Sequence, residues 1–378
     1  MTSGGGARAE TEQKQESGNG LFFNAQEAKM PDNSKLHKAK NEKNDEFYTQ
    51  YADIEAEMTA YTEYNPDVFQ DKTVLLPCDD PDRSNFTKYF SDNFERLGLK
   101  KLISTCYVKG SGQQSLWGEE GEGRGKILTV TRVTGISGQA VGFGRHGLLD
   151  GNGDFRSAEV SKLRDEADII VTNPPFSLFR PFLTWIMESG KQFSIIGNQN
   201  AITYKEVFPL LKNNQVWLGY SIHSGDRKFN VPDDYPLEAA TCGIDSDGRR
   251  FVRVTGVRWF TNIDHGQRHE PLHLETMDYN LKYNEKLRKK LKQCFEAREY
   301  PKYDNCEAIE VPFTESIPSD YGGVMGVPIT FMDKYNPAQF EILGHEHDIG
   351  GDGGDGVEHG QFEVNGFGVF KRILIRAK

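Results

Sequence analysis

The chain has 378 residues, of which 27% are charged, and its formal net charge at neutral pH is -11. This length predicts two domains, or one large domain with a satellite, and is ample for a sizeable core. There is no run of about 18 apolar residues, so we expect no membrane span, and the N-terminus lacks the pattern of a secretory leader. Five widely spaced cysteines without a CxxC pair favour reduced thiols in the cytoplasm and predict no metal centre.

The acidic net charge counts against a nucleic-acid partner, because such a partner usually requires a basic face. The charge is a sum over the whole chain, however, and basic residues gather in the second half, chiefly at 249–258 and 282–292. A run of like charge is usually only a solvated face. We keep a basic nucleic-acid-binding surface as a hypothesis, with Arg249, Arg250 and Arg253 as candidate phosphate contacts.

The sequence begins with a polar, glycine-rich segment over residues 1–40, which is predicted to be a disordered tail. A helix follows, with Thr49 as its N-terminal cap. Residues 73–77 predict a short buried strand, 84–98 an amphipathic helix with a serine cap, and 100–108 a second strand. This strand–helix–strand order is typical of a parallel sheet.

The alternation continues beyond a glycine-rich loop at 109–125. The predicted strands are 126–133, 168–176, 192–202 and 215–221, of which 168–176 ends in a proline-rich turn. The predicted helices are 157–167, 177–190 and 204–214. This order predicts an α/β fold with a Rossmann-like, doubly wound and mostly parallel sheet over 41–264, to which 252–263 adds a further strand. A helix at 283–297 and short aromatic runs broken by Gly and Pro predict a smaller mixed domain at 265–378.

The tetrapeptide Asn173-Pro174-Pro175-Phe176 directly follows the predicted strand DIIVT. In an open α/β sheet, ligands bind at the carboxyl ends of the strands. The Asn173 side-chain oxygen and the Pro174 carbonyl can both accept hydrogen bonds from an NH2 group on a base, which frees the nitrogen lone pair for attack on a methyl group. The prolines hold both acceptors in position beforehand, and Phe176 offers a face for stacking.

A simple loop-breaking role is the alternative for Asn-Pro-Pro. The buried strand before the tetrapeptide and the alternating α/β context favour the chemical role. A base must leave the duplex to reach such a pocket. The pattern therefore indicates methyl transfer to the amine of a flipped base.

Two turns contain aspartates that are candidates for contacts to a methyl donor. Asp154-Phe155 combines a carboxylate, which can accept from an adenine amino group, with an aromatic ring. Asp79 or Asp80, after the first strand, suits the cationic amine of the donor's methionine part. Turn and N-cap roles are common for aspartate, so the structural alternative stays open for each of them.

The stretch Phe47-Tyr48-Thr49 places two aromatic rings before the first predicted strand. Such rings suit the apolar and sulfonium region of the donor. Core packing is an equally ordinary role for them, and both interpretations stay open.

The strings DEFYT, PCDDPDRSNF, GDF and TNPPF, in this order, resemble the EcoRI-type adenine-specific DNA methyltransferases. The strings GNQNAITYKEVFPLLK, WFTN, YDNCEAIEV, IPSDYGGVMGVPITFMDKYNPAQFEILG and FKRILIRAK resemble the same family and are more specific than the tetrapeptide. The resemblance covers most of residues 35–378. It implies a Rossmann-like catalytic domain, a DNA target-recognition region at 265–378, and transfer of the methyl group of S-adenosylmethionine to the N6 amine of a flipped adenine in double-stranded DNA.

The same resemblance implies that the target amine binds at Asn173 to Phe176. The implied donor contacts are Phe47, Tyr48, Thr49, Pro77, Cys78, Asp79, Asp80, Asp154 and Phe155. The turn at 77–80 lacks the GxG of most methyltransferases of this fold, which leaves open which of its two aspartates takes the donor's amine. The resemblance also implies a monomer, and a cognate restriction endonuclease is a candidate partner.

Methylation of RNA, or of a glutamine amide in a protein, uses the same amide chemistry and stays open as an alternative. The net charge fits a protein substrate, whereas the C-terminal strings favour DNA. A catalytically silent DNA-binding regulator on the same scaffold is the alternative outside enzymes, and the intact tetrapeptide counts against it.

Overall fold

A computed structural model describes residues 48–108, 123–134, 140–223, 225–231, 237, 241–346 and 361–378. The chain divides into a unit over Met1–Lys43 and a compact unit over Asn44–Lys378, which holds all of these residues. The predicted tail at 1–40, Phe47 and residues 109–122 lie outside the described ranges. Among the described helices, none has both the length and the apolar character that crossing a membrane requires.

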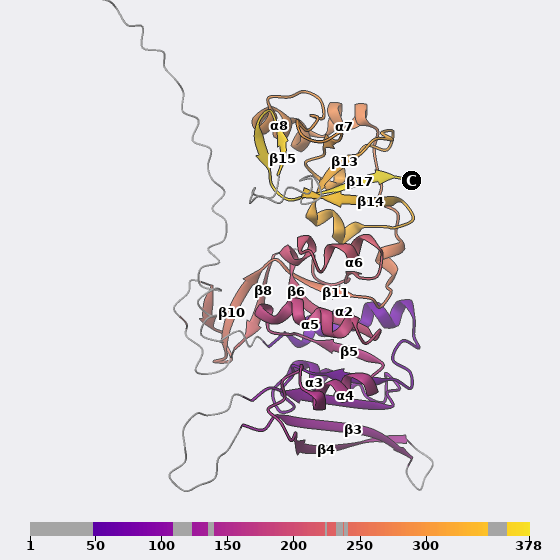
Figure 1. The fold of residues 1–378 in the computed structure, drawn as a ribbon, viewed down its shortest axis with the longest axis vertical. Helices are drawn as coiled ribbons and strands as arrows, with labels where there is room; N and C mark the ends of the chain where they lie inside the picture. The colour runs from indigo at the N-terminus through magenta and orange to yellow at the C-terminus, as the bar shows by residue number, and fades with distance from the viewer. Residues whose placement is uncertain are drawn as a thin grey trace, which may run out of the picture. The chain divides into compact units, whose positions relative to one another are not determined.

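An eight-stranded sheet forms the centre of the compact unit, in the order β4-β3-β2-β1-β5-β6-β11-β7, and Figure 1 shows β4 and β3 at one end of it. Its strands are β1 (Thr73–Leu76), β2 (Lys101–Cys106), β3 (Lys126–Thr134), β4 (Ala140–Leu148), β5 (Ile169–Thr172), β6 (Gln192–Asn198), β7 (Trp217–Leu218) and β11 (Val257–Thr261). β1, β2, β5 and β6 are parallel, whereas β3 and β11 each run antiparallel to both neighbours. Six of the eight strands therefore point the same way, and the predicted fold class is confirmed.

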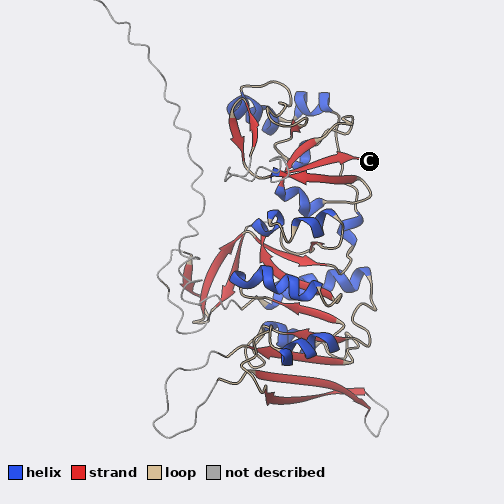
Figure 2. Cartoon of the chain, in the orientation of Figure 1, coloured by secondary structure: helices blue, strands red, loops and turns tan. Residues whose placement is uncertain are grey.

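Helices cover both faces of this sheet, as a doubly wound fold requires (Figure 2). They are α2 (Tyr51–Tyr64), α3 (Asn85–Asp92), α4 (Ala158–Glu166), α5 (Phe179–Met187) and α6 (Phe208–Lys212). Trp259 and Phe260 are consecutive in β11, so their side chains point to opposite faces. Phe86 of α3 packs against Trp259 with ring centroids 5.9 Å apart, and Phe179 of α5 packs against Phe260 at 5.1 Å. α3 and α5 therefore lie on opposite faces.

The two strands that carry the candidate site are buried along their whole length. Every residue of β1 and of β5 is buried. A parallel strand covered by helices on both faces reads as a continuous apolar run, because neither face meets water. This is why TVLL and IIVT predicted strands without any polar alternation.

The start of α2 differs from the prediction. The helix begins at Tyr51 with Gln50 in the N-cap position and no side-chain cap, so Thr49 does not cap it. α3 has the predicted cap, since Ser84 Oγ accepts from the Phe86 N–H at 3.0 Å. Whether a residue caps a helix therefore depends on the local backbone geometry, and a threonine near the start of a helix is not sufficient to predict a cap.

The predicted strand over 252–263 is two strands that belong to different sheets. β10 (Arg250–Thr255) ends at Gly256, which has φ of +68°, and β11 follows it in the central sheet. A positive φ interrupts the extended backbone at no steric cost for glycine. β10 pairs antiparallel with β8 (Asp226–Asn230) and β9 (Cys242–Ile244), two strands that were not predicted, in a separate three-stranded sheet.

The C-terminal part contains a smaller mixed region, as predicted. Its elements are α7 (Met277–Tyr283), α8 (Glu285–Phe295), β12 (Ile309–Glu310), β13 (Met325–Pro328), β14 (Phe340–His345), β15 (Phe362–Val364), β16 (Phe367–Val369) and β17 (Arg372–Ala377). The four strands β12-β13-β17-β14 form one sheet. Arg258 of β11 is buried and forms a bidentate ion pair with Asp333, at 2.8 and 3.1 Å, so a buried charge pair joins this region to the central sheet.

Candidate functional site

Three predicted site segments meet at one edge of the central sheet. Residues 77–80 follow β1 and Asn173 follows β5, and these strands pair in parallel with Val74 opposite Ile169. Parallel neighbours end at the same edge, where ligands bind in open α/β sheets. The GNGDF loop follows β4, which points the same way because β3 is antiparallel to both β2 and β4. The donor and acceptor segments are therefore brought to a common edge.

Asp79 is buried in the turn after β1, with 5% of its surface exposed. Its Oδ1 accepts from Ser84 Oγ at 2.6 Å, and its Oδ2 accepts from Thr172 Oγ1 at 2.5 Å. Burial raises the pKa of Asp79 to about 7, although the two hydroxyl hydrogen bonds act to lower it. One carboxylate thus joins the cap of α3 to the residue that precedes Asn173.

Asp80 lies beside Asp79 in a different environment. Its side chain is 19% exposed, and its Oδ2 lies 3.5 Å from Lys126 Nζ. Its Oδ1 accepts from the Asp82 backbone N–H at 2.7 Å. Lys126 also pairs with Asp82 at 2.7 Å. Asp80 therefore presents a carboxylate that solvent or a ligand can still reach.

Strand β8 brings the N-terminal aromatic segment to the tetrapeptide. The Tyr48 N–H donates to the Asn230 carbonyl at 2.8 Å, and the Asn230 N–H donates back at 3.0 Å. The neighbouring residue of β8, Phe229, sets its ring edge-on to Phe176 with centroids 6.3 Å apart. Tyr48 and Phe176 thus both contact the end of β8.

Thr49 is buried, with 2% of its surface exposed. Its carbonyl accepts from Asn85 Nδ2, in the first turn of α3, at 2.7 Å. Its Oγ1 is buried and has no hydrogen-bond partner in the part of the chain that the structure describes. The N-terminal segment is therefore fixed to the same helix that Ser84 caps, and it has one hydroxyl available for a ligand.

The tetrapeptide turns the chain from β5 into a short helix. Asn173, Pro175 and Phe176 are half-buried and Pro174 is buried. The Pro175 carbonyl accepts from the Leu178 N–H at 2.8 Å, which starts a 3-10 turn that leads into α5. The two acceptors that the chemistry requires, on Asn173 and Pro174, are thus held between a buried strand and a helix.

The GNGDF loop packs tightly on the end of β2. Gly153 has φ of +83°, and a Cβ at this position would lie 2.3 Å from the Cys106 carbonyl oxygen. Asp154, next in the chain, accepts from Arg156 Nε at 2.9 Å and from Nη2 at 2.5 Å. The hydrogen bonds from Arg156 hold the pKa of Asp154 below its ordinary value. Asp154 is therefore a fixed, ionised carboxylate at the sheet edge.

Phe155 lies in the core. It is 5% exposed, and its ring packs against Phe182 at 4.9 Å and Trp185 at 5.5 Å. The Phe155 ring therefore has a packing role, although the sequence presented it as a ring for the methyl donor. Its packing fixes the loop that carries Asp154.

Pro77 and Cys78 begin the turn at residues 77–80, and both lie close to neighbouring parts of the site. The Pro77 carbonyl accepts from Thr105 Oγ1 at 3.4 Å. Desolvation raises the pKa of the Cys78 thiol well above its ordinary value, and the neighbouring carboxylates of Asp79 and Asp154 raise it further. Cys78 therefore lies close to both aspartates and stays a neutral thiol.

The three candidate phosphate contacts lie on or next to the separate sheet and do not share one face. Arg249 is exposed, with a nitrogen 4.0 Å from Asp247. Arg250 and Arg253 are three residues apart in β10, so strand alternation sends them to opposite faces. Arg253 is exposed, and its guanidinium lies 5.6 Å from the Phe251 ring centroid. The sheet itself adjoins the site through Phe229 of β8.

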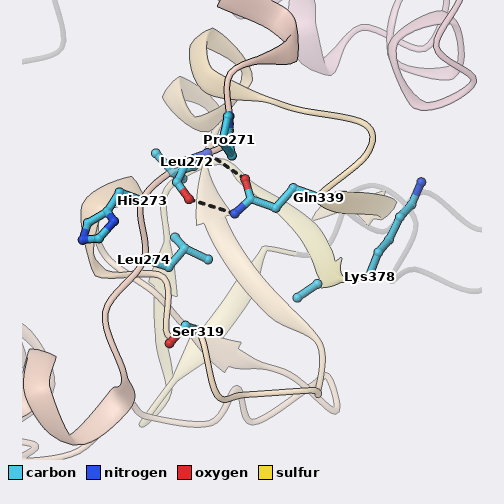
Figure 3. Close-up of a pocket in the computed structure, with 8 residues that line it drawn as sticks. Pro271, Leu272, His273, Leu274, Ser319, Gln339 and Lys378 are labelled. Carbon is cyan, nitrogen blue, oxygen red and sulfur yellow. Dashed lines mark hydrogen bonds between the residues drawn. The ribbon is translucent and has the colours of Figure 1, made fainter.

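A cavity of about 420 Å³ lies in the C-terminal region (Figure 3). It is lined by Pro271, Leu272, His273, Leu274, Ser319, Gln339, Ala377 and Lys378. The Gln339 amide pairs with the Leu272 backbone through two hydrogen bonds of 2.8 Å, which Figure 3 draws as dashed lines. It contains none of the predicted site residues and gives no support to the donor or base pocket.

Four residues that build the site were not predicted from the sequence. Ser84 was identified only as a helix cap, and Thr172 only as the last residue of a strand. A hydroxyl at the end of the apolar run IIVT is a usable signal, because a buried hydroxyl needs a partner. Phe229 and Asn230 carried no signal, since the pattern around β8 predicts no strand.

The comparisons with known proteins agree with each other. A family model described as adenine-specific methyltransferase EcoRI matches residues 35–378. Type II methyltransferase M.EcoRI from Escherichia coli is 42% identical over 359 residues, which cover 93% of this chain and 98% of that protein. Type II methyltransferases M.MpnI from Mycoplasma pneumoniae and M.MgeORF184P from Mycoplasma genitalium are each 35% identical over 82% of this chain, and cover 84% and 85% of their own lengths. No solved structure matches.

Proposed function

The chain belongs to the EcoRI family of adenine-specific methyltransferases, and we propose that it transfers the methyl group of S-adenosylmethionine to the N6 amine of a flipped adenine in double-stranded DNA, at a specific sequence. One observation carries the proposal: the Asp79 carboxylate accepts hydrogen bonds from both Ser84 and Thr172. It holds the donor turn against the residue before Asn173, and methyl transfer requires donor and acceptor to be held together in this way.

The side chains at the sheet edge fit this donor. The partly exposed carboxylate of Asp80 suits the donor's cationic amino group. The buried hydroxyl of Thr49 suits a polar atom of the methionine part. Asp154, kept ionised by Arg156, can accept from the donor's adenine amine. The other residues proposed to contact the donor or to support its site are Phe47, Tyr48, Pro77, Cys78, Asp79 and Phe155.

The proposed reaction needs no strong base. When bound, S-adenosylmethionine supplies an electrophilic methyl group on a sulfonium sulfur. The Asn173 side-chain oxygen and the Pro174 carbonyl accept the two N–H groups of the target amine, so the nitrogen lone pair is directed at the methyl carbon. The N–C bond forms as the S–C bond breaks, and the methylated amine then loses a proton to solvent. Phe176 stacks on the base, which has left the duplex.

Asn173→Ala tests the role of the tetrapeptide. Removing the amide oxygen is expected to lower kcat by about 100-fold or more, because one preorganised acceptor is lost. The donor dissociation constant should stay within about threefold, since Asn173 faces the acceptor. Transfer of labelled methyl groups to DNA, RNA and protein in parallel is the measurement. Transfer to RNA or protein in preference to DNA, or an unchanged kcat, contradicts the proposal.

Sequencing DNA from cells that express the chain, with a method that detects modified adenine, gives the base and its sequence context together. We propose that residues 265–378 read this context and that Arg249, Arg250 and Arg253 contact phosphates. We also propose a monomer that acts in the cytoplasm beside a cognate restriction endonuclease. Protection of the methylated DNA from that endonuclease would support the last point.

A further inference from the structure

The turn after β1 contains two adjacent aspartates whose roles the sequence leaves open. We propose that Asp79 is a positioning residue, which orients the acceptors of Asn173 and Pro174 through Thr172, and that Asp80 is the aspartate that meets the donor's amine. This inference rests on the proposed function and deepens it, because it assigns separate roles to two residues of the same turn.

Asp79 is unable to turn toward a ligand. Its backbone N–H donates to the Thr105 carbonyl at 2.9 Å, and its carbonyl accepts from Ser104 Oγ at 2.8 Å. Ser104 Oγ is in turn 2.7 Å from Thr87 Oγ1 of α3. Both carboxylate oxygens are engaged, and the side chain is 5% exposed. A donor amine could reach Asp79 only after these contacts break.

Thr172 links Asp79 to the proposed acceptors on Asn173 and Pro174. It is fully buried, and its hydroxyl donates to Asp79 Oδ2. Asn173 follows it directly, and Pro174 and Pro175 restrict the backbone beyond. With the downstream side rigid, the upstream anchor at Thr172 decides where the amide oxygen and the carbonyl point. A small displacement there is costly, because transfer depends on aligned acceptors.

The charge of Asp79 decides the direction of these hydrogen bonds. An ionised carboxylate accepts from both hydroxyls, whereas a protonated carboxyl must donate one hydrogen bond. Protonation therefore competes with donation from Thr172 or Ser84, and either change disturbs the anchor. Since burial raises the pKa of Asp79 to about 7, this switch falls near neutral pH.

Other charged or titratable groups lie on the turn that carries Asp79 or beside it. They are Cys78 and Asp80 on its own turn, Cys106 at the end of β2, Lys126 at the start of β3 and Asp154 after β4. α3 and β5 face it with the hydroxyls of Ser84 and Thr172. The pKa of Cys78 is raised by desolvation, that of Lys126 is raised by its hydrogen bond to Asp82, and that of Asp154 is lowered by Arg156. These three groups keep one charge state near neutral pH, so a loss of kcat on the acid side of neutrality reports on Asp79.

The experiment compares Asp79→Asn, Asp80→Asn, Thr172→Val and Thr172→Ser in the full chain. Donor affinity is measured by calorimetric titration with S-adenosylmethionine, and kcat at saturating donor and DNA from about pH 6 to about pH 9. Asp79→Asn and Thr172→Val should each lower kcat by about tenfold or more. Both should also abolish the fall in kcat on the acid side of neutrality, here called the acid limb, and leave the donor dissociation constant within about threefold of the wild-type value. Thr172→Ser keeps the hydroxyl and should restore both kcat and the limb. Asp80→Asn should weaken donor binding by about tenfold and keep the limb.

Three outcomes overturn the proposal. The first is that Asp79→Asn weakens donor binding as much as Asp80→Asn does and still shows the acid limb. The second is wild-type kcat and pH dependence in Thr172→Val, and the third is a wild-type enzyme without an acid limb. A failure of the proposed function looks different, because the wild type would then transfer no methyl groups to DNA while the donor titrations still compare the two aspartates.

Discussion

At the scale of single residues, the buried carboxylate of Asp79 has an energetic consequence that its exposed neighbours lack. Desolvation disfavours its charged form, and only two hydroxyls compensate. Folding therefore takes up a proton at this group between its unfolded pKa, near 3.8, and its folded pKa of about 7. Across that window the free energy of unfolding falls as the pH rises, because the folded state binds more protons than the unfolded state.

Asp79→Asn removes this dependence. Relative to the wild type, the variant is expected to gain about 2.5 kcal/mol of stability between pH 5 and pH 8, since only the part of the pKa shift from 5 to about 7 lies in this range. Urea unfolding at both pH values measures the difference, in which other titrating groups cancel. Asp71→Asn, at a side chain that is 72% exposed, is the matched control and should shift both values equally. A difference between Asp79→Asn and wild type that does not change with pH contradicts the account.

The tetrapeptide stands out in the sequence because the proposed chemistry restricts the residue types. Asn173 and Pro174 would supply two fixed acceptors, and few other pairs can do so. The choice between Asp79 and Asp80 could not be made, since it depends on which carboxylate the turn directs inward. Phe155 illustrates the same limit: a ring after a Gly-Asp turn reads alike whether it packs in the core or faces a ligand.

At the scale of elements, the hairpin of β3 and β4 shows where sequence patterns fail. The alternating β and α elements were predicted because apolar runs and caps mark them. β4 was missed because its sequence AVGFGRHGL carries three glycines, which weaken a strand signal. One reason for a glycine is spatial: a Cβ at Gly142 would lie 3.0 Å from the Phe94 ring. Such a contact between β4 and the turn that follows α3 has no signature in local sequence.

Gly153→Ala tests whether the GNGDF loop must be held against β2. The added Cβ meets a backbone carbonyl at 2.3 Å, which has no cheap way to move, so we expect a loss of about 3 kcal/mol or more and weaker donor binding. Gly190→Ala is the control, because Gly190 also has a positive φ, of +66°, but has no atom within 4 Å of the added Cβ. It should cost about 1 kcal/mol and leave donor affinity unchanged. Equal costs for the two variants would show that the contact is unimportant.

At the scale of the whole molecule, the net charge of -11 and a DNA substrate are compatible only if the local field differs from the sum. The three-stranded sheet offers such a place beside the tetrapeptide, but its basic residues are partly neutralised. Lys228 pairs with Asp245 at 2.7 Å, and Arg249 lies 4.0 Å from Asp247. Arg253 is the exposed arginine on the face that carries Phe251.

The salt dependence of DNA affinity shows how much Arg250 and Arg253 each contribute to phosphate binding. Each lost phosphate contact should reduce the slope of log K against log salt by about 0.9. We expect Arg253→Ala to reduce it by about this amount and Arg250→Ala, on the opposite face, to reduce it less. Lys88→Ala, on the exposed side of α3, is the control and should leave the slope unchanged. Unaltered slopes in both arginine variants would place the phosphate contacts elsewhere.

The ion pair between Arg258 and Asp333 bears on how such enzymes can be re-engineered. A shortened protein that stops at residue 264 would retain the buried arginine of β11 and discard its counter-ion. A lone cation in that setting costs several kcal/mol, so the chain up to residue 264 is not a module that can be excised without loss of stability. Hybrids that exchange the last hundred or so residues between relatives are expected to keep this stability only when the incoming segment restores an acid at the position of Asp333.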